Sequence, residues 1–222
     1  MDFAQIKRRL STLDTACICD ADKDLQYLRV VDPAIRPIRC GLKLVGRAHT
    51  VTCREDFLTV IKALRDAQEG EVIVIDSQNS RRALTGELFP TEALRKGLAG
   101  IVIDGPCRDT ETIRRLDLPY YARSVNCLAG TTNKLYETQI PIACGGVVVN
   151  PGDIVFGDDD GLVVGSEAQF ARIIESAEQI QQKEQQLLNA MAQGTSLLDM
   201  LNFDEHCANV HEGKPSKLQF LV

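Results

Sequence analysis

Two polar segments follow predicted buried strands and contain residue types that could carry chemistry. The segment SQNSRRALTGEL (77–88) follows a strand at 72–76, and DGPCRD (104–109) follows the strand GIVID at 100–104. Strands in an open parallel sheet present functional groups at their carboxyl ends. We therefore expect a binding or catalytic site at these segments.

Arg108 and Asp109 form the pair with the clearest chemical use. An arginine guanidinium can bind a carboxylate or an enolate oxygen, and a carboxylate can hold a hard divalent cation. In the other segment, Gly86 allows close backbone approach, and N–H groups at the start of the helix that follows can hold a substrate carboxylate. The combination suits a 2-oxo acid substrate.

Structural roles also account for each of these residues taken alone, and on pattern alone we favour them for the Arg-Asp pair. Asp109 could cap a helix that begins at Thr110, and Arg108 could be a surface or subunit-interface cation. Glu87 in a first helical turn would interact favourably with the helix dipole without doing chemistry.

Two further polar features are interpreted as structural. His49 lies in an alternating, strand-like segment and is expected to be a strand residue rather than a ligand. The run Asp158-Asp159-Asp160 resembles a metal site, but it stands before a glycine, which is typical of a polar hairpin turn.

The elements that must position these residues alternate between strand and helix. Such alternation predicts a parallel sheet with crossover helices. Residues 130–165 are rich in glycine and β-branched residues and predict antiparallel hairpins laid against that sheet, so the fold class is mixed α/β. The predicted strands are 44–53, 72–76, 100–104 and 119–122, and the predicted helices are 3–13, 14–22, 56–68, 88–97 and 110–116.

A long amphipathic helix is predicted from 167 to 192, with apolar residues on one side and a Gln/Glu/Lys-rich opposite face. We expect residues 1–192 to form a single domain. Residues 193–222 mix apolar and polar residues too evenly for a disordered tail. They are expected to form a C-terminal arm that packs on a neighbouring subunit.

Composition excludes several classes of function. The chain has 25 Lys+Arg against 31 Asp+Glu, and its scattered basic residues predict no nucleic-acid partner. No apolar stretch is long enough to cross a bilayer and no signal sequence is evident, so we expect a cytoplasmic protein without a membrane partner. The eight cysteines contain no CxxC pair and the three histidines lack zinc-ligand spacing, which disfavours a zinc hydrolase.

Four segments in order, together with LDTACICDA near the N-terminus, resemble the RraA-like family. The feature with most weight is an acidic residue, twenty intervening residues and then Arg-Asp, here Glu87 followed by Arg108-Asp109. The resemblance runs from about Leu10 to Glu184. The four segments are ALTGEL (83–88), GLAGIVIDGPCRD (97–109), LPYYARS (118–124) and VNPGDIVFGDDDGLVVGS (149–166).

The resemblance implies a layered mixed-sheet sandwich of the swivelling β/β/α type, with a C-terminal helical arm. Enzymes of the family are class II 4-hydroxy-4-methyl-2-oxoglutarate aldolases that release pyruvate and also decarboxylate oxaloacetate. By this resemblance Asp109 would bind Mg²⁺ or Mn²⁺, and Arg108 would stabilise the pyruvate enolate. The backbone around Gly86, Glu87 and Leu88 would bind the substrate carboxylate, and Glu87 would assist proton transfer.

The sequence departs from the family pattern in two places. The family usually has acidic residues at the second and third positions after its aspartate, where this chain has Glu111 and Thr112, and it often has Asp where this chain has Glu87. The resemblance also implies a homotrimer or hexamer with sites between subunits. A neighbour's arm would help to close each site, with Glu205 as a contributor.

Two other functions are compatible with the resemblance. The family's namesake is a regulator of ribonuclease activity, so the alternative to a lyase is a non-catalytic protein that binds a ribonuclease. A methyltransferase is disfavoured because no glycine-rich GxGxxG loop follows a first strand.

Overall fold

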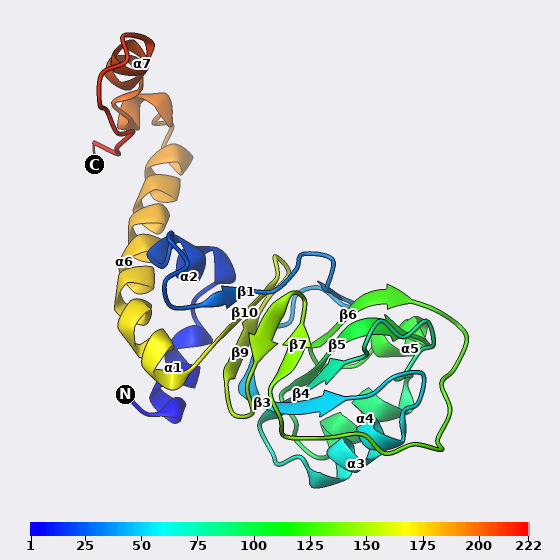
Figure 1. The fold of residues 1–222 in the computed structure, drawn as a ribbon. Coiled ribbons are helices and arrows are strands. Elements are labelled where there is room, and N and C mark those ends of the chain that lie inside the picture. The colour runs from blue at the N-terminus through cyan, green and yellow to red at the C-terminus, as the bar shows by residue number, and fades with distance from the viewer. Residues whose placement is uncertain (222) are drawn as a thin grey trace.

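Four parallel strands form the centre of the sheet in the computed structural model, which describes residues 1–221 (Figure 1). They are β3 (Leu44–Thr52), β4 (Glu71–Asp76), β5 (Gly100–Cys107) and β6 (Tyr120–Val125). Antiparallel strands complete an eight-stranded sheet of order β1-β10-β9-β3-β4-β5-β6-β2, which confirms the predicted mixed α/β fold. The added strands are β1 (Arg29–Val30), β2 (Arg36–Pro37), β9 (Ile154–Gly157) and β10 (Leu162–Gly165).

Both faces of the central strands are covered. Ile73 and Ile75 of β4 pack on the side of α3 (Leu58–Asp66) and α4 (Leu88–Arg95). Val72 and Val74 pack on the other side, against the separate hairpin of β7 (Ile142–Cys144) and β8 (Val147–Val149). Burial on both faces explains why β4 is a continuous apolar run rather than an alternating one.

A third apolar cluster joins the antiparallel end of the sheet to three helices. Phe156 of β9 and Val163 of β10 pack against Phe170 and Ile174. These two residues belong to α6 (Glu167–Ala192), which together with α1 (Phe3–Leu10) and α2 (Thr15–Ala21) forms the helical layer beside the sheet (Figure 1).

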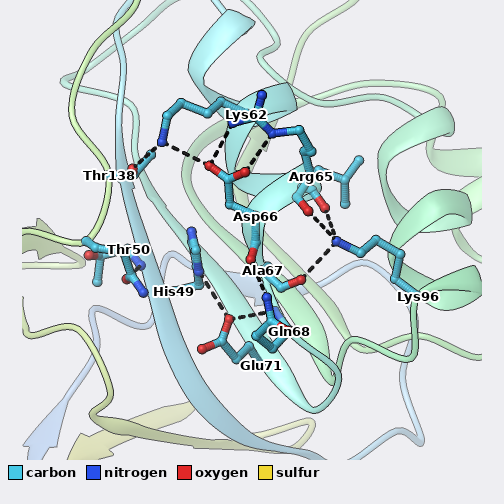
Figure 2. Close-up of polar contacts among 12 residues, drawn as sticks. His49, Thr50, Lys62, Arg65, Asp66, Ala67, Gln68, Glu71, Lys96 and Thr138 are labelled. Carbon is cyan, nitrogen blue, oxygen red and sulfur yellow. Dashed lines mark hydrogen bonds and ion pairs between the residues drawn. The ribbon is translucent and has the colours of Figure 1, made fainter.

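The ends of the two crossover helices are tied together by Lys96 (Figure 2). Its Nζ donates hydrogen bonds of 2.7, 2.8 and 2.9 Å to the carbonyl oxygens of Leu64, Arg65 and Ala67 at the end of α3. A cation there satisfies carbonyls that lack partners within the helix and opposes the negative end of its dipole. The contact fixes α4, whose first residues contribute to the site described below.

His49 is a strand residue, as the sequence predicted. It lies in β3, 4% exposed, with its Nδ1 3.1 Å from Oε2 of Glu71 (Figure 2). The same Glu71 oxygen accepts the N–H of Gln68 at 2.9 Å, so the carboxylate links β3 to the turn that follows α3.

The C-terminal arm continues beyond the far end of α6 with η1 (Leu198–Met200) and α7 (Phe203–His211), and the chain after α7 turns back toward α6 (Figure 1). Leu187 and Met200 are buried, and Leu201 pairs with Phe220. Helix α6 has the predicted bounds, whereas packing of the arm on a neighbour stays a prediction. Residue 222 of the predicted arm lies outside the described residues.

Three expectations about the elements were wrong. Strand β5 continues past Asp104 to Cys107 through an irregularity between Ile103 and Pro106, so the predicted loop at 104–109 is mostly strand. Helix α5 (Thr110–Ile113) is a single turn rather than seven residues. The β9–β10 hairpin extends the main sheet through β3 instead of lying against it.

Among residues 1–221, no helix combines the length and apolar character needed to span a membrane.

Candidate active site

The segment around Gly86 lies beside the end of β5. Strands β4 and β5 are in parallel register, with Asp76 opposite Asp104. The chain then leaves β4 and returns so that Thr85 forms a parallel bridge with Cys107, and the N–H of Arg108 donates to the carbonyl oxygen of Thr85 at 3.1 Å. The two segments selected from the sequence therefore meet at one place.

Gly86 has the close approach that its residue type predicted. A Cβ atom added at Gly86 would overlap Oδ2 of Asp109 and would lie 3.1 Å from Nε of Arg108. The N–H of Glu87 donates to Oδ2 of Asp109 at 3.3 Å. Nε of Arg108 lies 3.4 Å from the same oxygen. One small volume therefore contains the backbone of residues 86–87, the Arg108 guanidinium and the Asp109 carboxylate.

Asp109 adopts a left-handed backbone conformation, with φ 57° and ψ 37°. It stands at the N-cap position of α5, but its side chain makes no capping hydrogen bond. The capping role considered from the sequence is therefore wrong. A non-glycine residue in this region costs about 1–3 kcal/mol and is concentrated at functional sites.

Glu87 and Leu88 stand at the beginning of α4. Glu87 occupies the N-cap position without a side-chain capping bond and is partly exposed, and its carbonyl accepts the N–H of Thr91 at 3.2 Å. The Leu88 side chain is 75% exposed. The N–H of Phe89 donates to the carbonyl of Gly86 and Pro90 has no N–H, so the N–H of Leu88 and the positive end of the helix dipole are what favour an anion here.

The oxygen donors present suit an open magnesium-type site. The Asp109 side chain is 37% exposed, and no cluster of three or more His, Cys, Asp or Glu side chains suitable for a metal occurs in residues 1–221. Mg²⁺ is commonly held by one or two carboxylates, with waters and substrate oxygens completing its shell, whereas structural zinc needs four protein ligands. A divalent cation at Asp109 therefore fits, and a closed zinc site does not.

Two buried hydroxyl groups beneath the site were not selected from the sequence. Oγ1 of Thr85 and the hydroxyl of Tyr120 form a hydrogen bond, and both residues are at most 2% exposed. Asn126 adds a second connection, because its N–H donates to Cys107 and its side chain donates to the carbonyl of Arg81. These hydrogen bonds connect the segment at 77–88 to β6 and to the end of β5.

Asp104, in contrast, is occupied by structural partners. Its carboxylate accepts hydrogen bonds from Nε of Arg123 and from the N–H of Gly145, the latter at 2.7 Å. It therefore anchors the turn of the β7–β8 hairpin on the face of the sheet opposite α4.

The Asp158-Asp159-Asp160 run forms the turn between β9 and β10, as predicted. Asp158 accepts hydrogen bonds from the N–H and hydroxyl of Thr15, and Asp159 accepts the N–H of Gly41. These carboxylates organise neighbouring loops. Glu111 of α5 is paired with Arg115, which follows the helix. Glu205 lies in α7, at the far end of α6 from the site in the same chain (Figure 1).

The family model described as RraA-like (aldolase/RraA) matches residues 15–164 of this chain, a range that includes the whole site. The chain belongs to the RraA-like family. A relative from Halalkalibacterium halodurans, named "Putative 4-hydroxy-4-methyl-2-oxoglutarate aldolase", is 35% identical over 172 residues, which cover 77% of this chain and 80% of the relative.

Solved structures of RraA-like proteins share the fold. An uncharacterized protein from Pseudomonas syringae pv. tomato matches with a TM-score of 0.78 and 27% identity, covering 88% of this chain and 96% of that one. The RNA-processing inhibitor RraA from Thermus thermophilis matches with a TM-score of 0.62 and 28% identity, covering 67% and 91%. The family thus includes relatives named for a lyase activity and for inhibition of RNA processing.

Replacing Asp109 with glycine separates its chemical role from its backbone strain. Glycine adopts positive φ without steric cost, so we expect Asp109→Gly to unfold at the same urea concentration as the wild type or a higher one. Equilibrium unfolding followed by circular dichroism measures this. Asp109→Val should unfold at a lower urea concentration, because a β-branched residue is sterically disfavoured at positive φ. A large loss of stability in Asp109→Gly would instead show that the carboxylate holds the fold together.

Proposed function

We propose that this protein is a divalent-metal-dependent lyase that cleaves a carbon–carbon bond of a 4-hydroxy-2-oxo acid, releasing pyruvate, or decarboxylates oxaloacetate. The observation that carries the proposal is the convergence of Gly86, Arg108 and Asp109 on one volume at the start of α4. The relatives named as aldolases support the reaction class.

The substrate carboxylate binds at the first turn of α4. The N–H of Leu88 lies at the positive end of the helix dipole, where an anion is favoured, and the N–H of Glu87, which donates to Asp109 at 3.3 Å, lies beside it. Gly86 lets this backbone approach Asp109 closely, because a side chain at Gly86 would overlap the Asp109 carboxylate. Binding there places the reacting carbons beside Arg108.

Arg108 stabilises the electrons released when the bond breaks. Retro-aldol cleavage and decarboxylation both leave an enolate of pyruvate. A guanidinium beside the developing oxyanion lowers the activation free energy for breaking the carbon–carbon bond. A divalent cation at Asp109, Mg²⁺ or Mn²⁺, would act as a Lewis acid on the 2-oxo group. Removing a single donor to an oxyanion commonly costs about 100- to 1000-fold in kcat.

Glu87 assists proton transfer in the proposed reaction. Its side chain is partly exposed at the mouth of the site and makes no capping bond. Retro-aldol cleavage requires removal of the C4 hydroxyl proton, and the enolate must then gain a proton at C3 to become pyruvate. A carboxylate directly or through one water can perform either transfer.

The lyase is tested by pyruvate release from oxaloacetate and from 4-hydroxy-4-methyl-2-oxoglutarate after treatment with EDTA. Added Mg²⁺ or Mn²⁺ should restore turnover in the wild type, and Asp109→Ala should lose about 100-fold or more because its metal ligand is gone. Arg115→Ala is the matched control, since the exposed Arg115 side chain, two residues past the end of α5, pairs with the exposed Glu111, and this variant should keep full activity.

No turnover above the metal blank on either substrate would contradict the lyase. It would favour the alternative, a non-catalytic protein that binds a ribonuclease, which is supported by the likeness to the RNA-processing inhibitor. Binding of a ribonuclease would then be unaffected by EDTA and by Asp109→Ala.

We further propose a homotrimer or hexamer in which sites lie between subunits and the arm packs on a neighbour. Apolar side chains are exposed on both surfaces involved: Leu88 and Ile61 flank a hollow of about 210 Å³ between α3 and α4, and Phe203 and Val210 lie on α7. Light scattering after gel filtration should give three or six times the chain mass. A monomer at micromolar concentration would contradict the assembly.

A further inference from the structure

We propose that the hydrogen bond between Thr85 and Tyr120 is a positioning contact that holds the carboxylate-binding segment in register with Arg108 and Asp109. Thr85 is 2% exposed and Tyr120 is 1% exposed, so the bond lies in the core below the site. The inference rests on the proposed function, because it assigns these residues to the same site.

Thr85 connects the two segments that form the site. Its carbonyl accepts the N–H of Arg108 at 3.1 Å, and its backbone bridges to Cys107. The next residue is Gly86, where a Cβ atom would overlap the carboxylate of Asp109. A displacement of Thr85 therefore changes the distance from the backbone of 86–88 to both the guanidinium and the metal-binding oxygen.

Tyr120 fixes Thr85 from a rigid element. It lies in β6, in register with Ile101 of β5, and its ring packs in the cluster that also contains Leu84 and Cys107. Burial raises the pKa of Tyr120 well above its ordinary value, and the neighbouring Cys107 thiol raises it further. The phenol therefore stays neutral and acts as a fixed hydrogen-bond partner rather than as an acid or base.

Loss of one partner leaves a buried hydroxyl without a hydrogen bond. A buried hydroxyl without a partner destabilises the folded protein more than replacement of both hydroxyls by apolar groups of the same shape. The segment around Thr85 is therefore expected to shift until the remaining hydroxyl finds another partner. Displacements of about 1 Å at catalytic groups reduce turnover strongly, and loss of a contact that orients a metal ligand commonly weakens metal binding about 10- to 100-fold.

Tyr121 is a matched control for Tyr120. It is equally buried and adjacent in β6, but its side chain packs on the opposite face of the sheet. Its hydroxyl donates to the carbonyl of Asp158 at 3.0 Å, in the β9–β10 turn. Tyr121→Phe therefore removes one buried hydroxyl from the same strand without touching the segments that form the site.

The experiment compares Tyr120→Phe, Tyr121→Phe and Thr85→Ser in the 222-residue chain. Three quantities are measured: kcat and KM for pyruvate release, the Kd for Mn²⁺ by calorimetry, and amide hydrogen exchange of peptides covering 84–88 and 106–109. We expect Tyr120→Phe to lower kcat and to weaken Mn²⁺ binding about tenfold each, with faster exchange in both peptides. Tyr121→Phe should change none of the three.

Thr85→Ser keeps the hydroxyl and should retain kcat within about twofold. The double variant Thr85→Val/Tyr120→Phe removes both hydroxyls, so it should regain stability in urea while kcat stays low. A purely structural contact would lower stability in Tyr120→Phe without changing kcat or the Mn²⁺ Kd of the folded protein, and that result would overturn the inference.

Failure of the lyase and failure of the positioning contact give different results. If the wild type has no lyase turnover, the proposed function fails. The positioning contact would still be supported if Tyr120→Phe, and not Tyr121→Phe, showed faster exchange in both peptides and weaker Mn²⁺ binding. If the wild type turns over and Tyr120→Phe matches Tyr121→Phe in all three measurements, the function stands and the positioning contact is wrong.

Discussion

The close approach of the Gly86 backbone to the Asp109 carboxylate is the constraint on which the site depends. A side chain at Gly86 would occupy the place of the carboxylate oxygen, and the left-handed conformation of Asp109 keeps that oxygen near the start of α4 rather than over α5. Both features cost conformational stability. They are maintained because the segments that carry them are fixed by the surrounding sheet and helices.

The sheet provides that rigidity through contacts between neighbouring crossovers. Ser77, fully buried, donates its hydroxyl to the carbonyl of Asp104 at 2.5 Å, where β5 becomes irregular before it continues to Cys107. Lys96 joins the ends of α3 and α4. These contacts fix the last residues of α4 and the irregular part of β5, and α4 and β5 are the two elements that meet at the site.

The sequence predicted the parallel core, and the two polar segments selected from it meet in the structure, because buried strands and the glycine between them have local signals. The apolar run before Asp76 and the glycine at 86 indicated a buried strand and a close approach without reference to other parts of the chain. The roles given to Arg108 and Asp109 depended instead on the family resemblance, since an aspartate before a short helix is also typical of a cap.

Features that depend on distant pairing could not be predicted. The extension of β5 to Cys107 results from its pairing with β6 and from the bridge to Thr85, neither of which has a local signal. Alternation in β6 places Tyr120 and Tyr121 on opposite faces, but only the tertiary structure shows which of them meets Thr85.

Exchange of the pyruvate methyl protons with D₂O tests whether this site stabilises the enolate of pyruvate, and it does so without knowledge of the natural substrate. Proton NMR in the presence of Mg²⁺ should show exchange catalysed by the wild type and slowed about 100-fold in Arg108→Ala. If the wild type exchanged these protons no faster than Mg²⁺ alone, the site would not stabilise the enolate. If Arg108→Ala exchanged them as fast as the wild type, Arg108 would not have the proposed role.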